Sequence, residues 1–168
     1  MSKTASLPSE ITAALPLGYT IRELQKTDKA EVLEVLTVLT TVGDITNAAW
    51  DERFEYISKH DDTYTILCII DDEGKVCATG SLIIERKFIR NCGLVGHIED
   101  IAVAKDQQGK KLGLRMINAL DHIAEKAGCY KVCTKKSTRS IRTPAVGEYW
   151  ANMLFSCSPV DLGLLGKQ

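Results

Sequence analysis

A strongly amphipathic segment between two apolar strands constrains the fold of this chain more than any other feature. Over residues 109–126 the apolar side chains recur at helical spacing and form one stripe, made of Leu112, Met116, Leu120, Ile123, Ala124 and Ala127. The flanking residues 97–103 and 130–132 have the composition of strands, and Gly128 ends the helix. A strand, helix and strand in this order predict a parallel crossover late in the chain.

The earlier part of the chain predicts antiparallel pairing. The β-branched run Tyr64–Ile70 leads through the turn residues 71–74 into a second run over residues 76–85, which is typical of a hairpin. Three more elements are expected before it: a half-buried strand over 19–24, a helix over 27–39 with Asp28 as a cap, and a helix over 50–59 opened by Thr46 or Asn47. We therefore expect one α/β domain, with a mixed β-sheet flanked by helices.

Composition excludes several classes of function. A chain of 168 residues with 45% hydrophobic side chains is the size of one ordinary domain, and its net charge of −1 gives no support for bulk electrostatic binding of nucleic acid or acidic membranes. No apolar run approaches the roughly 20 residues of a membrane helix, and no basic-then-apolar segment opens the chain. We expect a cytoplasmic protein without membrane insertion.

Six cysteines raise the question of disulfides or a metal. Their spacing offers no second ligand pair to match Cys129 and Cys133, and nothing else indicates secretion. Reduced thiols and the absence of a metal are the expectation.

A glycine-containing turn precedes the long helix. It consists of Gln107, Gln108, Gly109, Lys110, Lys111, Leu112 and Gly113. Glycines let the backbone approach a ligand closely, and the free amides of a first helical turn attract phosphate. The turn lacks the spacing of a P-loop or a Rossmann motif, and such glycines more often form only a tight turn. Both interpretations stay open on this pattern alone.

Two acidic residues interrupt the strand before that turn. Strict alternation places Ile98, Asp100 and Ala102 on one face, so that a carboxylate is expected to point toward covered sheet. One interpretation is a solvated strand end. The other is a pair of carboxylates, Glu99 and Asp100, that holds or deprotonates a substrate amine beside an anion site.

These segments resemble a known family. The strings Gly-His-Ile-Glu-Asp-Ile-Ala-Val (residues 96–103), Gln-Gly-Lys-Lys-Leu-Gly (108–113) and Gly-Cys-Tyr-Lys-Val (128–132) are similar to the core of the glucosamine-6-phosphate N-acetyltransferases, within the GNAT acetyltransferase superfamily. Leu-Thr-Thr-Val-Gly-Asp (39–44) and Gly-Ser-Leu-Ile-Ile-Glu-Arg-Lys-Phe-Ile (80–89) fit the same family. The resemblance implies acetyl-CoA as cosubstrate, glucosamine 6-phosphate as acceptor, and a role in UDP-N-acetylglucosamine biosynthesis.

The resemblance also implies roles for individual residues. The pyrophosphate of acetyl-CoA would bind at Gln108, Gly109, Lys110, Lys111, Leu112, Gly113 and Leu114, and the pantetheine arm along Ile101, Ala102 and Val103. Thr40, Lys87 and Arg90 would contact the sugar phosphate, with Glu99 and Asp100 at the sugar and its 2-amine. The other substrate-binding positions would be Phe88, Ile89, Tyr130 and Lys131. Taken without the resemblance, Lys87 and Arg90 are equally well a solvated charge run, and Tyr130 a packing aromatic.

The implied reaction is direct transfer in a ternary complex. The amine must lose a proton before it attacks the thioester, and Glu99 is the first candidate for the base, directly or through a water. A backbone amide within residues 100–102 is expected to polarise the thioester carbonyl. A homodimer is implied as well.

The resemblance ends near Val132, which divides the chain into three parts. We expect a flexible leader (1–17), an acetyltransferase core (18–132) and an atypical basic C-terminal segment (133–168), which has five basic and two acidic residues. The family's Tyr that protonates the departing thiolate has no counterpart there. Two alternatives follow: a non-catalytic acyl-CoA-binding protein that has lost the sugar site, or a GNAT enzyme acting on another amine.

Overall fold

The computed structural model describes residues 7–134 and 137–140, which form a six-stranded sheet in the order β1-β2-β3-β4-β5-β6. The strands are β1 (Thr20–Glu23), β2 (Tyr64–Ile70), β3 (Val76–Arg86), β4 (Leu94–Val103), β5 (Cys129–Thr134) and β6 (Ser137–Ser140). The helices are α1 (Ser9–Ala13), α2 (Lys29–Leu36), α3 (Asn47–Lys59), α4 (Ile89–Cys92) and α5 (Leu112–Lys126), with 3₁₀ turns η2 (Lys26–Asp28) and η3 (Lys105–Gln107).

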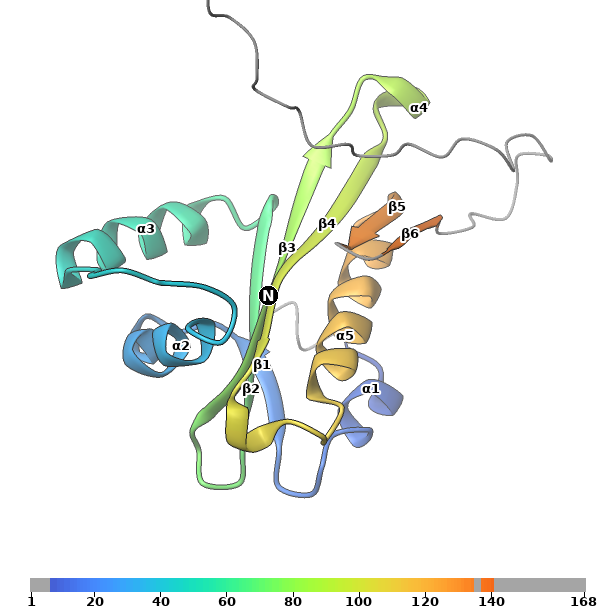
Figure 1. The fold of residues 1–168 in the computed structure, drawn as a ribbon. Helices are drawn as coiled ribbons and strands as arrows, with labels where there is room; N and C mark the ends of the chain where they lie inside the picture. Colours follow the sequence, from blue (N-terminus) through green and yellow to red (C-terminus); the bar gives the residue numbers. More distant parts are fainter. Residues whose placement is uncertain (1–6, 135–136, 141–168) are drawn as a thin grey trace, which may run out of the picture.

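Helices cover both faces of the sheet. In Figure 1, α2 and α3 lie on one side of the strands, and α1 and α5 lie on the other. All neighbouring strands are antiparallel except β4 and β5, which α5 connects in parallel. The predicted mixed sheet, the hairpin and the late crossover are all confirmed.

The larger core cluster lies under α5, as its stripe predicts. Leu112, Met116, Leu120, Ile123 and Ala124 are all buried, while Ala127, which follows the helix, is exposed. A second, smaller cluster joins α2 to the opposite face through Val32 and Val35 with Cys68, Val76 and Ala102. The sheet is therefore packed on both sides.

Pairing between β4 and β5 stops early. Their register runs from Leu94 opposite Cys129 to Ile98 opposite Thr134. On its other edge β4 stays paired with β3 as far as Val103. Within the described residues, the segment 99–103 of β4 thus has no strand beside it on the β5 side, and its backbone groups there face an open edge.

Part of the expected leader packs against the core. Ser9–Ala13 form α1, and Leu7, Ile11 and Leu15 pack against the cluster under α5. The flexibility of the leader stays a prediction, although this part of it contacts the core. Residues 1–6, 135–136 and 141–168 lie outside the described residues, and the division at 132 and 133 stays a prediction, although β5 crosses it.

The helix expected over 27–39 is shorter and is capped differently. It begins as η2, and α2 ends at Leu36. Asp28 stands at the N-cap of α2, but its carboxylate makes no bond to the amides of that helix. Oδ2 instead accepts from the Gln25 amide at 2.8 Å. The second expected helix is α3, and there Thr46 does cap, accepting from the Ala49 amide at 3.1 Å.

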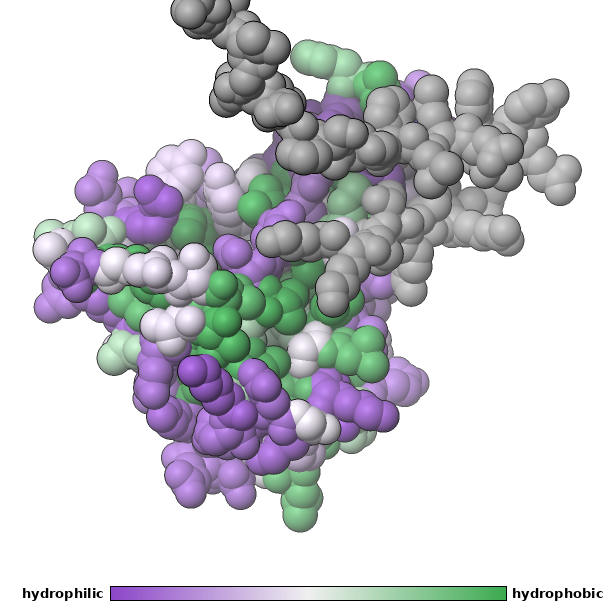
Figure 2. Space-filling view, viewed as in Figure 1, coloured by the Kyte–Doolittle hydropathy of each residue, from purple (hydrophilic) through white to green (hydrophobic). Residues whose placement is uncertain are grey.

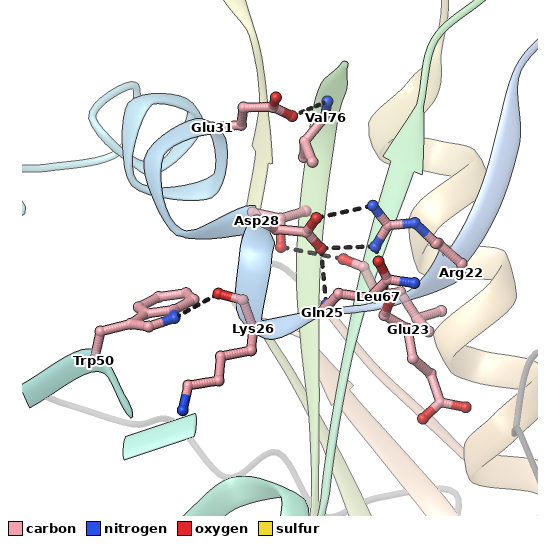
Figure 3. Close-up of polar contacts among 10 residues, drawn as sticks. Arg22, Glu23, Gln25, Lys26, Asp28, Glu31, Trp50, Leu67 and Val76 are labelled. Atoms are coloured by element: carbon pink, nitrogen blue, oxygen red, sulfur yellow. Dashed lines mark hydrogen bonds and ion pairs between the residues drawn. The ribbon is translucent and has the colours of Figure 1, made fainter. Parts of the chain in front are cut away.

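A buried ion pair attaches the start of α2 to β1. Arg22 Nη1 and Nη2 donate to the two Asp28 carboxylate oxygens at 2.6 and 2.9 Å, and the Asp28 side chain is only 7% exposed. On the next turn Glu31 Oε2 accepts from the Val76 amide at 2.7 Å. Figure 3 shows that both bonds tie α2 to strands of the sheet.

Within the described part of the chain, no helix has both the length and the apolar character of a membrane span. Cys68, Cys77, Cys92, Cys129 and Cys133 are free thiols, and Cys157 lies outside the described residues. Burial raises the pKa of the Cys68 thiol to about 12, so this thiol is held protonated and unreactive.

Replacing Asp28 by Asn should lower the free energy of unfolding by about 2 kcal/mol, because the change leaves the Arg22 guanidinium without its charged acceptor. Burial tends to raise the pKa of the Asp28 carboxyl, but the hydrogen bonds from Arg22 and from the Gln25 amide lower it overall. Its contribution is therefore present above the unfolded pKa of about 4 and is lost as the pH falls through the folded pKa. Urea unfolding at several pH values measures both effects.

The matched control is Asp62→Asn. Asp62 pairs with Arg86 at 2.7 Å, but the two side chains are 66% and 52% exposed, so the loss should be about 0.5 kcal/mol or less. Equal losses for Asp28→Asn and Asp62→Asn would contradict a stabilising role for the buried pair.

Candidate functional site

An extra residue in β4 shapes the centre of the site. Ser81 of β3 stands opposite Glu99 and Thr79 stands opposite Ala102, so two steps along β3 match three along β4. Asp100 adopts a left-handed backbone with a φ of 54°. This is a β-bulge, which strands use to redirect side chains.

The bulge changes which face each side chain takes. Ile98 packs in the cluster under α5, whereas Ala102 packs in the cluster beneath α2. Ile101 and Val103 turn to the α5 side. The predicted alternation, with Ile98 and Ala102 on one face, is therefore wrong, because strict period 2 cannot pass through an inserted residue.

Both carboxylates are exposed at the bulge. Glu99 and Asp100 are surface side chains, so the expectation that one of them points toward covered sheet is also wrong. Asp100 instead borders a cavity on the α2 and α3 side, together with Ser81 and Thr79 of β3. The structure thus places an acidic pair at the beginning of the open edge of β4.

The turn before α5 presents unoccupied backbone amides. Gly109 and Lys111 have φ values of 87° and 59°, so the helix begins at Leu112 and not at residue 109 as predicted. No side chain caps this 15-residue helix, and its first described intrahelical bond runs from the Arg115 amide to the Lys111 carbonyl at 3.2 Å. The preceding amides are therefore available to an anion, at the positive end of the helix dipole.

The side chains of Lys110 and Gln108 in the turn form hydrogen bonds to neighbouring groups. Lys110 Nζ donates to Tyr19 Oη and to Gln107 Oε1, both at 2.7 Å, and the hydrogen bond with Tyr19 raises the Lys110 pKa. Gln108 Nε2 donates to the Val103 carbonyl at 3.5 Å. Lys111 is exposed. Lys110 is thus a fixed cation beside the amides, and Tyr19 is a contributor that the sequence did not indicate.

Close packing brings the turn to the edge of β4. A Cβ added to Gly113 would lie 3.6 Å from Ile101 and 3.7 Å from Val103. In Figure 2, apolar side chains gather in the middle of this face, between α2 and α5. Apolar side chains thus lie between the two helices, and Ile101 and Val103 of β4 lie beside the turn.

The tip of the β3–β4 hairpin carries four of the predicted substrate-binding residues, Lys87, Phe88, Ile89 and Arg90. Arg90, Asn91 and Cys92 have φ values of 56°, 54° and 58°, so α4 is a left-handed turn that projects from the sheet (Figure 1). Lys87 forms an ion pair with Glu85, and the Arg90 guanidinium lies 5.8 Å from the centre of the Tyr130 ring. The hairpin thus brings Arg90 and Tyr130 together, as predicted for one site.

Glu85 organises the base of this hairpin. Its second carboxylate oxygen lies 2.9 Å from His97 Nε2, and hydrogen bonds from Lys87 and His97 lower the Glu85 pKa. The sequence did not indicate this residue, because its diagonal contact with His97 depends on the strand register, with Ile83 opposite His97.

The remaining predicted residues lie around these groups. Lys131 pairs across the sheet with Val95, while Phe88 and Ile89 are 98% and 65% exposed at the hairpin tip. Thr40 is exposed in the connection between α2 and α3, where its amide donates to the Leu36 carbonyl at 3.5 Å. Among the described residues, no group of three or more His, Cys, Asp or Glu side chains is placed to hold a metal ion.

Comparison with known proteins identifies the family. Residues 30–149 match the family model for the acetyltransferase (GNAT) family. The chain belongs to the GNAT acetyltransferase family. A glucosamine 6-phosphate N-acetyltransferase of Candida albicans is 44% identical over 128 residues, which cover 76% of this chain and 86% of that protein.

Two further relatives extend the comparison. A probable glucosamine 6-phosphate N-acetyltransferase 2 of Oryza sativa is 37% identical over 170 residues, covering 98% of this chain and 96% of its own length. The crystal structure of glucosamine-6-phosphate N-acetyltransferase from Arabidopsis thaliana superposes with a TM-score of 0.68 at 36% identity, over 79% of this chain and 98% of the other. The family match and the rice match both continue past Val132, where the recognised motifs end.

Replacing Lys111 by Gly should raise the free energy of unfolding by about 1 kcal/mol, because glycine adopts the left-handed backbone without the steric cost that lysine carries. Chemical denaturation of the ligand-free protein measures the change. Lys126→Gly is the control, since Lys126 lies in the last turn of α5, where glycine should destabilise by about 0.5 to 1 kcal/mol. A loss of stability in both variants would contradict a strained Lys111.

Proposed function

We propose that this GNAT protein transfers the acetyl group of acetyl-CoA to the 2-amine of glucosamine 6-phosphate, giving N-acetylglucosamine 6-phosphate. The observation that carries the proposal is the 44% identity to the Candida albicans enzyme over 86% of that protein's length. The acidic pair at the bulge, the open strand edge and the uncapped helix provide the surfaces that the reaction needs.

The free amides before Leu114, with Lys110 beside them, fit the pyrophosphate of acetyl-CoA. The peptide groups of Ile101 and Val103 lie on the open edge of β4, where an extended pantetheine arm can accept and donate hydrogen bonds as a neighbouring strand does, while Ala102 between them pairs with Thr79 of β3. With the pyrophosphate at the turn before α5, the pantetheine arm runs along β4 and its thioester lies near the bulge at Asp100.

The bulge supplies groups for proton transfer and for polarisation. Glu99 takes the proton of the sugar ammonium, directly or through a water, and the neutral amine attacks the thioester carbon. A backbone amide within residues 100–102 donates to the carbonyl oxygen as negative charge develops on it. Asp100 holds the amine, and much of the acceleration comes from orienting two bound substrates.

The hairpin supplies a cationic site for the sugar phosphate. Lys87 and Arg90 provide charge, and Tyr130 and Lys131 on β5 complete the side that faces them. Glu85 holds the Lys87 ammonium through one of its three donors, which leaves two for a phosphate. The family resemblance assigns Thr40 on the α2–α3 connection, and Phe88 and Ile89 at the tip, to the same substrate site.

The exposed tip supports a homodimer as part of this proposal. Phe88 is 98% exposed and Ile89 is 65% exposed, side by side on a projecting hairpin. Large apolar side chains of this kind are common in protein interfaces. Sedimentation velocity of the purified protein gives the oligomeric state directly.

The deciding assay mixes purified protein with acetyl-CoA and glucosamine 6-phosphate and follows thiol release. We expect sugar-dependent release, and a loss in kcat of about 10²- to 10⁴-fold in Glu99→Gln, because glutamine cannot accept the proton. Glu52→Gln, an exposed change on α3, is the matched control and should keep the wild-type rate. Tight acetyl-CoA binding without turnover would instead favour the non-catalytic alternative.

Arg90→Ala tests the phosphate site. Removing one charge-assisted contact should lower kcat/KM for glucosamine 6-phosphate by about 10- to 100-fold, and the preference over unphosphorylated glucosamine should fall by the same factor. Arg86→Ala is the control, since Arg86 is held by Asp62. Parallel losses on both sugars in Arg90→Ala would contradict a phosphate contact.

A further inference from the structure

A small apolar cavity opens directly beside the bulge, on the α2 and α3 side of the sheet. It has a volume of about 130 Å³ and is bordered at the strands by Thr79, Ser81 and Asp100. Thr79 is 2% exposed, and its hydroxyl donates to the Leu67 carbonyl at 3.1 Å. The hydroxyl is therefore already satisfied, and Thr79 adds little polarity to the cavity wall.

The roof of the cavity is a helix that packs incompletely. Trp50, Phe54 and Ile57 follow one another at helical spacing along α3, and all three border the cavity. None of the residues of α3 is buried. An apolar stripe that lies over an apolar hollow without filling it gains stability when an apolar ligand enters.

The cavity does not fit the acceptor sugar. Of the residues proposed to contact the sugar, Asp100 alone borders it, while Lys87, Arg90 and Tyr130 belong to the hairpin tip and β5. Its floor and walls are mainly apolar, with Leu24, Leu36 and Ile66 among them, and Arg53 of α3 also borders it. Buried sugar hydroxyls would find few hydrogen-bond partners there.

Position and chemistry together indicate what the cavity holds. The open edge of β4 ends at the bulge, so a thioester bound along Ile101 and Val103 presents its acyl group at Asp100, where the cavity opens. The inference rests on the proposed function, which supplies the acyl-CoA and its direction. We propose that the cavity is an acyl-chain pocket, and that the protein binds and transfers short linear acyl groups longer than acetyl, such as butyryl, from their CoA thioesters.

The volume agrees with this assignment. An apolar cavity of about 150 Å³ can hold a molecule the size of benzene, so 130 Å³ accommodates the additional carbons of a butyryl chain. The transfer is balanced as for acetyl: the new C–N amide bond forms, the C–S bond breaks, and the amine proton leaves with the thiol. Each buried methylene strengthens binding by about fourfold.

Competition binding and steady-state rates with acetyl-, butyryl- and octanoyl-CoA test the proposal. Butyryl-CoA should bind about 15-fold more tightly than acetyl-CoA, and octanoyl-CoA should exceed the cavity and lose this gain. Ile66→Phe, which fills the cavity, should lower the butyryl-to-acetyl ratio in binding and in kcat/KM by about tenfold or more. Leu36→Phe provides a second filling variant should Ile66→Phe fold poorly.

Two further variants test whether the acyl preference depends on this cavity. Phe54→Ala enlarges the cavity from its exposed roof and should raise the use of octanoyl-CoA. Ile11→Phe, the same exchange as in Ile66 but on α1 against the other face of the sheet, should leave the acyl preference unchanged. The assignment of an acyl pocket would be wrong if butyryl-CoA binds more weakly than acetyl-CoA. It would also be wrong if the cavity variants alter KM for the sugar without altering the chain-length preference.

Failure of the proposed acceptor is a separate result. A protein that prefers butyryl-CoA in binding, and loses that preference in Ile66→Phe, has the acyl pocket even if glucosamine 6-phosphate releases no thiol. The competition-binding experiment therefore tests the acyl pocket, and the thiol-release assay tests the proposed acceptor.

Discussion

One inserted residue in β4 sets the geometry on which the rest of the site depends. The bulge at Asp100 exchanges the faces of the strand, so that Ile101 and Val103 face α5 while Ala102 faces α2. The same insertion places Glu99 and Asp100 at the surface where pairing with β5 has just ended. Without it, period-2 alternation would bury one carboxylate against a helix, at a considerable cost in desolvation.

The helices and strands with regular hydrophobic spacing could be predicted, because their apolar residues recur at the positions that become buried. The stripe under α5 and the run Tyr64–Ile70 are examples, and both lie where expected. We could not predict the bulge, the left-handed backbone of Lys111 or the left-handed turn at Arg90. The spacing of apolar residues does not depend on the torsion angles of single residues. Each of these three features lies at the site, where local backbone strain concentrates.

Contacts between distant residues escaped prediction for a different reason. Glu85 meets His97 through the register of two strands, and Tyr19 reaches Lys110 across 91 positions of sequence. Charged and polar pairs of this kind require the assembled sheet to be known first. The residues of the turn and the acidic pair were located in sequence only because they are contiguous and resemble a family motif.

The open edge of β4 also has a consequence for solubility. Unpaired strand edges next to apolar surface are where one protein molecule can add a strand to another, and proteins usually cover such edges or place charges on them. Here the segment 99–103 begins with two carboxylates, but Ile101, Ala102 and Val103 follow with no charge among them. A cosubstrate lying along this edge would occupy its hydrogen bonds, so the ligand that the protein consumes would also shield it from self-association.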